Sequence, residues 1–291
     1  MEELWVEVDG ARVFVRGWGE RSGRPLFCWH GVGLTSRASM FLNEAGPLLA
    51  DGYGLRVLAL DAPGFGKSPP IERERYQPQA LVDLIPPMLE ALGLERVGFM
   101  GFSWGGDLGC HLAARHPSCV RTLVLLDAGY EDPPLDPTLT YDQRVERNNL
   151  AWRTSCAPSW EAVANALRDN HRRWTPAVEE AARAGWRKCA NQLVPAGSPS
   201  IVAAVEHGMA HAPPSATRPR MAENRLPVLL VAGGDADEED LRQFAADVPQ
   251  AEIVCAEGTG HDVLTDGGPE VVDVIGRWLE ANNPVSSEGD S

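Results

Sequence analysis

The chain has 291 residues, 44% of them hydrophobic, which suits one large globular core with an insertion. Its formal net charge of −15 at pH 7 repels phosphate backbones and anionic membrane surfaces, which argues against nucleic acid and membrane partners. No apolar run approaches the roughly 20 residues of a membrane span and the opening residues do not resemble a signal peptide, so we expect a cytoplasmic protein.

Short apolar runs bounded by Gly, Asp or Pro predict the strands of a mostly parallel sheet. In chain order, these runs are 4–8, 13–16, 26–29, 55–60, 97–100, 122–127, 228–231 and 252–256. Helical patterns between them predict helices at 36–50, 78–92, 104–116, 238–247 and 269–281. Pro86 and Pro87 should break or kink the second helix. The alternation indicates an α/β fold with helices on both faces of the sheet.

The fifth apolar run leads into Gly101-Phe-Ser-Trp-Gly105, a Gly-x-Ser-x-Gly pattern placed between a strand and a helix. A serine at such a sharp turn stands exposed at the carboxyl edge of the sheet. The two glycines lack the Cβ atoms that would clash in so tight a turn, so Ser103 tolerates strained backbone angles. We therefore predict that Ser103 is a nucleophile.

A serine nucleophile needs a base and donors for an oxyanion, and the chain contains candidates for both. His261 follows the last predicted strand, which gives the Ser…acid…His chain order of one triad arrangement. Near the other end, the third apolar run leads into His30-Gly31-Val32-Gly33, a small-residue loop that can present backbone N–H groups.

With these motifs in order, the chain resembles the α/β-hydrolases over nearly its whole length. The segment 61–68, Asp-Ala-Pro-Gly-Phe-Gly-Lys-Ser, also resembles the Asp-x-x-Gly-x-Gly-x-Ser loop that follows the fourth strand in that family. The resemblance implies an eight-stranded, mostly parallel sheet. It also implies oxyanion donors at the backbone N–H groups of Val32 and Trp104.

Between residues 131 and 225, proline-rich joints bracket helical stretches that carry Trp152, Trp160, Trp174 and Trp186. The resembled family inserts a helical cap after strand 6, so we expect a cap at 131–225 and a core at 1–130 and 226–281. These tryptophans are more typical of helix packing than of substrate contact. The polar tail, 282–291, is expected to be disordered.

The acid of the triad is left with three candidates. Asp127 ends a strongly apolar strand and would lie at the same sheet edge as Ser103, although an aspartate there also serves to anchor a cap hinge. In the resembled family the acid usually follows the seventh strand in a Gly-x-x-Asp turn, where this chain has Asp235 and Asp237. Those two are better interpreted as capping a solvated helix start. We favour Asp127, then Asp235, then Asp237.

The resemblance and the motifs together predict a serine hydrolase that cleaves an ester, lactone or thioester of a small, mainly apolar molecule. Two alternatives stay open. One is non-hydrolytic chemistry in the same pocket, such as acyl transfer, carbon–carbon cleavage, cyclisation or perhydrolysis. The other is a non-catalytic ligand-binding protein on the same scaffold. The sequence does not fix the substrate or the oligomeric state.

We expect neither a cofactor nor a metal. Gly66-Lys67-Ser68 looks like the end of a phosphate loop, but position 61 is Asp where that motif requires Gly. His207 and His211 share a helix face without a further ligand at a suitable spacing, so we assign them to packing. Six cysteines without a Cys-x-x-Cys pair indicate reduced, mostly buried side chains.

Overall fold

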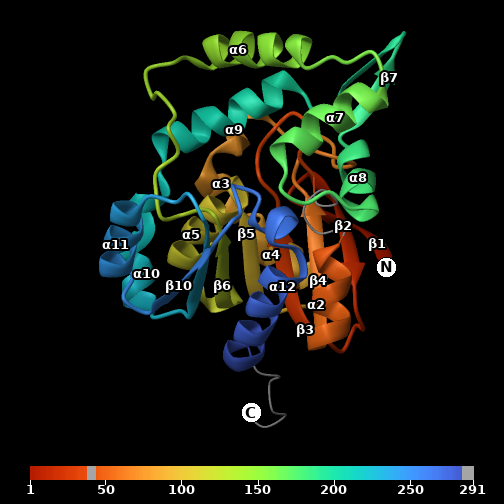
Figure 1. Cartoon of the computed structure of the whole chain (residues 1–291). Helices are drawn as coiled ribbons and strands as arrows, with labels where there is room; N and C mark the ends of the chain where they lie inside the picture. Colours follow the sequence, from red (N-terminus) through yellow and green to blue (C-terminus); the bar gives the residue numbers. More distant parts are fainter. Residues whose placement is uncertain (38–43, 284–291) are drawn as a thin grey trace.

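The computed structural model describes residues 1–37 and 44–283, and its centre is a twisted sheet of eight strands (Figure 1). The strand order is β1-β2-β4-β3-β5-β6-β9-β10. The strand bounds are β1 Glu2–Val8, β2 Ala11–Trp18, β3 Arg24–Trp29, β4 Leu55–Asp61, β5 Val97–Phe102, β6 Val120–Leu126, β9 Val228–Gly233 and β10 Ala251–Ala256. β2 is antiparallel to β1 and to β4, and the other pairs are parallel. This confirms the predicted sheet.

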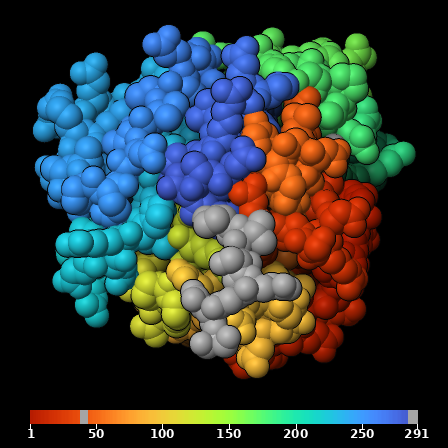
Figure 2. Space-filling view, turned by 90° about the horizontal axis from the view of Figure 1, so that it is seen from below, coloured from red at the N-terminus to blue at the C-terminus, as the bar shows by residue number. Residues whose placement is uncertain are grey.

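Helices cover both faces of the sheet, and two apolar clusters fill the spaces between them. The helices that cover the sheet are α2 Ala45–Tyr53, α3 Pro78–Val82, α4 Ile85–Ala91, α5 Trp104–Arg115, α10 Arg218–Asn224, α11 Glu238–Asp247 and α12 Val263–Asn282, with short 3₁₀ turns at Arg73–Tyr76, Pro117–Cys119 and Pro214–Thr217. α2 and α12 cover one face and lie side by side, as the orange and blue surfaces in Figure 2 show. α3, α4, α5, α10 and α11 cover the other.

Some predicted helix bounds were wrong for local reasons. Ser36 and Arg37 are not helical, α2 begins at Ala45, and the prediction for 38–43 falls outside the described residues. The helix predicted at 78–92 is two helices, and the prolines lie in the first turn of α4, where a missing N–H costs little. α12 begins at Val263, but Gly268, with φ of 52° and ψ of −138°, interrupts it. The helix predicted at 269–281 therefore corresponds to the second part of α12, and the short part before Gly268 was not predicted.

Residues 131–225, which we call the insert, contain α6 Tyr141–Thr154, α7 Trp160–Asn170, α8 Pro176–Arg183, a hairpin of β7 Trp186–Cys189 and β8 Gln192–Pro195, and α9 Pro199–His211. These elements gather at the top of the view in Figure 1. The hairpin was not predicted, and Trp186 lies in it instead of in a helix. Trp174 lies between α7 and α8, also outside a helix.

The packing differs from the predicted domain boundaries at the end of the insert and at the end of α12. The last part of the insert, from the 3₁₀ turn through α10, packs on α5 of the core. At the other end of the chain, Asn282 is the last residue of α12 and Asn283 is buried, so order extends into the predicted tail. The prediction for 284–291 lies outside the described residues.

All six cysteines are free. Cys28, Cys110 and Cys119 are buried, Cys156 is partly buried, and Cys189 and Cys255 are exposed. Only half of the cysteines are therefore buried, fewer than predicted. No helix of the described part of the chain is long and apolar enough to cross a membrane.

Candidate active site

Ser103 occupies a strained turn between β5 and α5. Its φ of 52° and ψ of −123° lie in a region that side chains other than glycine rarely adopt. Close backbone packing enforces the turn: a Cβ on Gly101 would lie 2.1 Å from the carbonyl oxygen of Gly105, and one on Gly105 would lie 2.2 Å from that of Trp29. The glycines are therefore sterically required, as predicted, and the turn presents Ser103 at the carboxyl edge of the sheet.

His261 and Asp127 come together from distant parts of the chain. His261 Nδ1 donates to Asp127 Oδ2 at 2.7 Å. The other carboxylate oxygen, Oδ1, accepts from the backbone N–H of Gly233 at 2.8 Å and from the hydroxyl of Tyr130 at 3.1 Å. The Asp127 side chain is 8% exposed and that of His261 is 60% exposed. A buried, fully hydrogen-bonded carboxylate thus orients a solvent-accessible imidazole.

The Asp127 carboxylate also alters the electrostatics of the base. The hydrogen bond that His261 donates to Asp127 is the largest influence on the pKa of His261 and raises it above the usual 6.5, and partial burial opposes that effect. The more distant carboxylates of Asp262 and Glu131 raise the pKa of His261 further. The imidazolium form is therefore stabilised at this position, as a proton acceptor in acyl transfer requires.

The two other candidate acids lie elsewhere. Asp237 is the N-cap of α11, and its Oδ1 accepts from the backbone N–H groups of Glu239 at 2.8 Å and Asp240 at 3.3 Å. This confirms the capping interpretation for Asp237. Asp235 is exposed in the turn after β9. The carboxylate hydrogen-bonded to His261 is that of Asp127, the candidate that the sequence favoured.

The loop after β3 runs directly beside Ser103. A Cβ on Gly31 would lie 3.2 Å from the Cβ of Ser103. His30 is buried and holds this loop: its Nδ1 donates to the carbonyl of Gly31 at 2.7 Å, and its Nε2 accepts from the N–H of Ala62 at 3.0 Å. Burial is the main cause that lowers the pKa of His30, so the ring is neutral and structural.

The two predicted oxyanion donors flank this arrangement. Val32 lies in the loop that His30 holds. Trp104 is the first residue of α5, and the first N–H groups of a helix have no partner within it. The indole of Trp104 is buried against Trp29, with ring centroids 5.7 Å apart at 89°, which fixes the start of the helix.

Ser103, Asp127 and His261 line one cavity of about 160 Å³. The remaining lining residues are Asp107, Ala128, Gly129, Glu131, Pro133, Pro134 and Met209. Met209 comes from α9 of the insert, and the prolines come from the segment that leads into it.

Sequence reasoning missed Asp107, Glu131 and Met209. Asp107 lies four residues after Ser103 on α5, one turn along the same face, and this spacing was the available signal. Its Oδ1 accepts from the N–H of Gly129 at 3.1 Å, and burial raises the pKa of Asp107 to about 8. Glu131 and Met209 reach the cavity only through the tertiary fold.

His207 and His211, set aside as metal ligands, lie on α9 with ring centroids 4.6 Å apart. Within residues 1–37 and 44–283, no group of three or more His, Cys, Asp or Glu side chains is arranged to hold a metal ion.

Comparison with known proteins places this geometry in a family. A family model described as alpha/beta hydrolase fold matches residues 24–267. A putative non-heme haloperoxidase of Mycobacterium phage D29 is 36% identical over 126 residues, which are 43% of each chain. A 2-hydroxy-6-oxononadienedioate/2-hydroxy-6-oxononatrienedioate hydrolase of Cupriavidus pinatubonensis (strain JMP 134 / LMG 1197) is 36% identical over 105 residues, 36% of this chain and 35% of the relative. This chain therefore matches less than half the length of these two relatives.

Among solved structures, E-2-(acetamidomethylene)succinate hydrolase superposes with a TM-score of 0.77 at 21% identity, covering 96% of this chain and 99% of the other. At that identity the likeness speaks for the fold alone. The family model covers most of the chain and agrees with the sheet order and the serine turn. The chain is a member of the alpha/beta hydrolase fold family.

Proposed function

We propose that this protein is a serine hydrolase that cleaves an ester, lactone or thioester bond of a small substrate through an acyl-enzyme. The observation that supports it best is the shared cavity: Ser103 on its strained turn faces the same space as His261, whose Nδ1 is held by the buried carboxylate of Asp127. The coarser conclusion, an enzyme of the hydrolase type, agrees with the hydrolases among its relatives.

The proposed mechanism follows from the protonation that this hydrogen bond imposes. Because Nδ1 of His261 donates to Asp127, Nε2 is left as the proton acceptor. Nε2 takes the proton of Ser103 Oγ as that oxygen attacks the acyl carbon. Asp127 stabilises the imidazolium, and the N–H groups of Val32 and Trp104 bind the oxyanion.

Collapse of the tetrahedral intermediate breaks the bond to the leaving group, which takes the proton from His261 Nε2. A water molecule, deprotonated by the same nitrogen, then attacks the acyl-enzyme. This releases the acid and returns the proton to Ser103.

We also propose that the insert acts as a cap. Met209, Pro133 and Pro134 close the cavity with apolar atoms above Ser103 and His261. In an enzyme with a cap, the enclosing side chains select the substrate and exclude water.

The charges around the cavity narrow the substrate class. The carboxylate of Glu131 joins that of Asp127 on its wall, and no Lys or Arg is among the described residues that line it. Asp107, whose pKa is raised to about 8, is largely protonated near pH 7 and adds little charge. A substrate with carboxylates of its own would meet repulsion there. We therefore propose neutral or cationic substrates, in contrast to the dioate named for the Cupriavidus relative.

The proposal is tested with a fluorophosphonate probe, an ester panel and a Ser103→Ala variant. We expect the probe to label the folded wild-type protein and not the variant, and we expect at least one neutral ester to be hydrolysed. A folded wild-type protein that resists the probe, or that binds esters without turnover, contradicts the proposal and favours a non-catalytic binding role.

The similarity to a putative haloperoxidase makes non-hydrolytic chemistry the second candidate. Reaction in ¹⁸O-labelled water separates the two, because hydrolysis places solvent oxygen in the released acid. A product without solvent oxygen, formed at a comparable rate with another nucleophile, favours transfer or perhydrolysis.

A further inference from the structure

Asp266 lies in the first turn of α12, five residues after His261, and its side chain is only 5% exposed. Its Oδ2 accepts a hydrogen bond from the backbone N–H of Gly260 at 3.0 Å. Gly260 is the residue directly before His261. The carboxylate of Asp266 therefore holds the main chain at the point where it enters the residue that bears the imidazole.

The second oxygen of the same carboxylate binds the insert. Oδ1 of Asp266 accepts from the backbone N–H of Arg172 at 3.0 Å and lies 3.5 Å from Nδ1 of His171. Both residues belong to the link between α7 and α8. One buried carboxylate thus joins two segments that are about ninety positions apart in the sequence.

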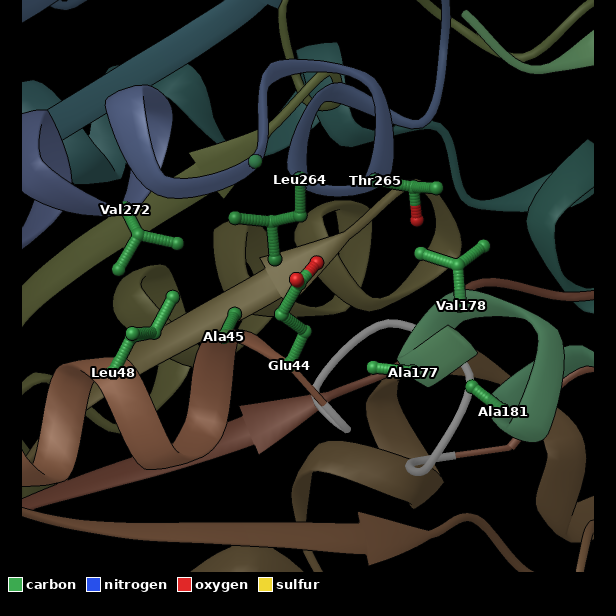
Figure 3. A pocket seen from close by; sticks show the side chains of 10 residues that line it. Glu44, Ala45, Leu48, Ala177, Val178, Ala181, Leu264, Thr265 and Val272 are labelled. Atoms are coloured by element: carbon green, nitrogen blue, oxygen red, sulfur yellow. The ribbon is translucent and has the colours of Figure 1, made fainter. Parts of the chain in front are cut away.

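The α7–α8 link is itself fixed to the core by separate contacts. The guanidinium of Arg173 forms two hydrogen bonds to the carboxylate of Glu44, at 2.5 and 2.8 Å. Figure 3 shows Ala177, Val178 and Ala181 of α8 facing Leu264 and Thr265 of α12 and the residues at the start of α2. The pocket between these three helices has room for about one water molecule.

His261 itself is weakly held by packing. Its side chain is 60% exposed, and its contacts are the hydrogen bond to Asp127 and a tilted ring contact with Phe102 at 5.0 Å between centroids. The direction of an exposed ring depends on the backbone that carries it. Displacement of reacting groups by about 1 Å can cost roughly a hundredfold in rate.

We infer that Asp266 is a positioning residue for His261, and that it ties the orientation of this base to the placement of the α7–α8 link. The inference rests on the proposed function, in which His261 is the base. When the link moves away from the core, Asp266 loses the N–H of Arg172, and its hold on Gly260 alters with it.

The test compares Asp266→Asn with Glu44→Gln. In Asp266→Asn the amide has one oxygen, so whichever way it turns, one of the two N–H groups loses its acceptor. Glu44→Gln makes the same change of carboxylate to amide at the other core contact of the link, without touching Gly260. Both are assayed on a small acetyl ester and a longer acyl ester.

For Asp266→Asn we expect kcat to fall about 10-fold to 100-fold on both esters with KM within about twofold. The low-field ¹H NMR signal of His261 Nδ1–H should broaden or shift. For Glu44→Gln we expect that signal unchanged and kcat within about threefold. Equal losses in the two variants, or an unchanged signal in Asp266→Asn, overturn the inference.

Amide hydrogen exchange on the wild-type protein provides a check that needs no variant. The N–H groups of Gly260 and Arg172 should both be protected, and fast exchange at either contradicts the inference. Failure of the proposed function would be seen separately, as a wild-type protein that the fluorophosphonate does not label, while the NMR signal and the exchange rates still report on Asp266.

Discussion

The backbone N–H of Ser103 donates a hydrogen bond to the carbonyl oxygen of Leu126, the residue directly before Asp127, at 3.0 Å. The N–H of Asp127 in turn donates to the carbonyl of Val231 at 2.8 Å. The ends of β5, β6 and β9 are therefore joined through main-chain atoms. Side-chain substitutions that keep these bonds should alter the chemistry of the site more than its folding.

Replacing Asp127 by Asn should lower kcat by roughly 10³-fold to 10⁴-fold, because an amide can stabilise the wrong tautomer of His261 and not the imidazolium. The measurement is steady-state turnover of a neutral ester. Asp237→Asn is the matched control: Asn caps helices as well as Asp does, so activity and stability should both stay close to wild type. Turnover unchanged in Asp127→Asn removes Asp127 from the triad.

The acidic limb of the pH profile should lie above pH 6.5. Asp127 raises the pKa of His261, so kcat/KM falls as the pH drops through that raised value and the base becomes protonated. In Asp127→Asn the limb should move to lower pH. The pair also stabilises the fold below the unfolded pKa of histidine, and this contribution is lost as the pH rises through the folded pKa.

NMR titration of His261 in both proteins checks this sign directly. A titration midpoint at or below the ordinary value in the wild-type protein, or no difference between wild type and variant, is inconsistent with the prediction.

The carboxylates of the cavity should make the protein prefer neutral over anionic acyl groups. The p-nitrophenyl esters of butyric and succinic acid are similar in size and differ by one charge, so their ratio of kcat/KM isolates this effect. We expect the butyrate to be favoured about 10-fold or more, and we expect Glu131→Gln to narrow the ratio. Glu161→Gln, an exposed change on α7 outside the cavity lining, should leave the ratio as it is. A succinate preferred by the wild-type protein counts against the proposed substrate class.

Gly105→Ala should abolish labelling of Ser103 and lower stability by several kcal/mol, because the new methyl would lie 2.2 Å from the carbonyl oxygen of Trp29. Gly52→Ala in α2 is the opposite case. No atom lies within 4 Å of the added Cβ, and alanine is the better helix former by about 1 kcal/mol. Denaturant titration of both variants measures their free energies of unfolding. Equal values for Gly105→Ala and Gly52→Ala would contradict the prediction and show that the backbone around Ser103 can shift to accept a methyl group.

The sequence predicted what depends on local chemistry. Continuous apolar runs predicted the buried parallel strands, and the two glycines around Ser103 predicted the turn, because both are consequences of backbone sterics and burial. The preference for Asp127 followed from the place where its strand ends. The contacts that join this carboxylate to His261 and to the N–H of Gly233 are long-range, and no sequence pattern contains them.

The features that were missed depend on tertiary packing. The β7–β8 hairpin is short and largely exposed, so it lacks the apolar run that identifies a strand. Gly268-Pro269 is a typical helix boundary, and the structure does interrupt α12 there. The short helical piece before it was missed: Asp262 caps its start, and Asp266 accepts hydrogen bonds from the N–H groups of Gly260 and Arg172. The position of Asp107 and Glu131 on the cavity wall could not be predicted, because it arises only when α5 and the chain after β6 come together in the fold.

The kink at Gly268 separates two parts of α12 that have different neighbours. It divides α12 into a short piece that contacts the α7–α8 link and a long piece that packs against the sheet. A straight rod would transmit any tilt of its first turn along its whole length. Because the helix is interrupted at this glycine, the direction of the short piece is set by the link and by the buried side chains of Val263 and Leu264, while the direction of the long piece is set by the sheet.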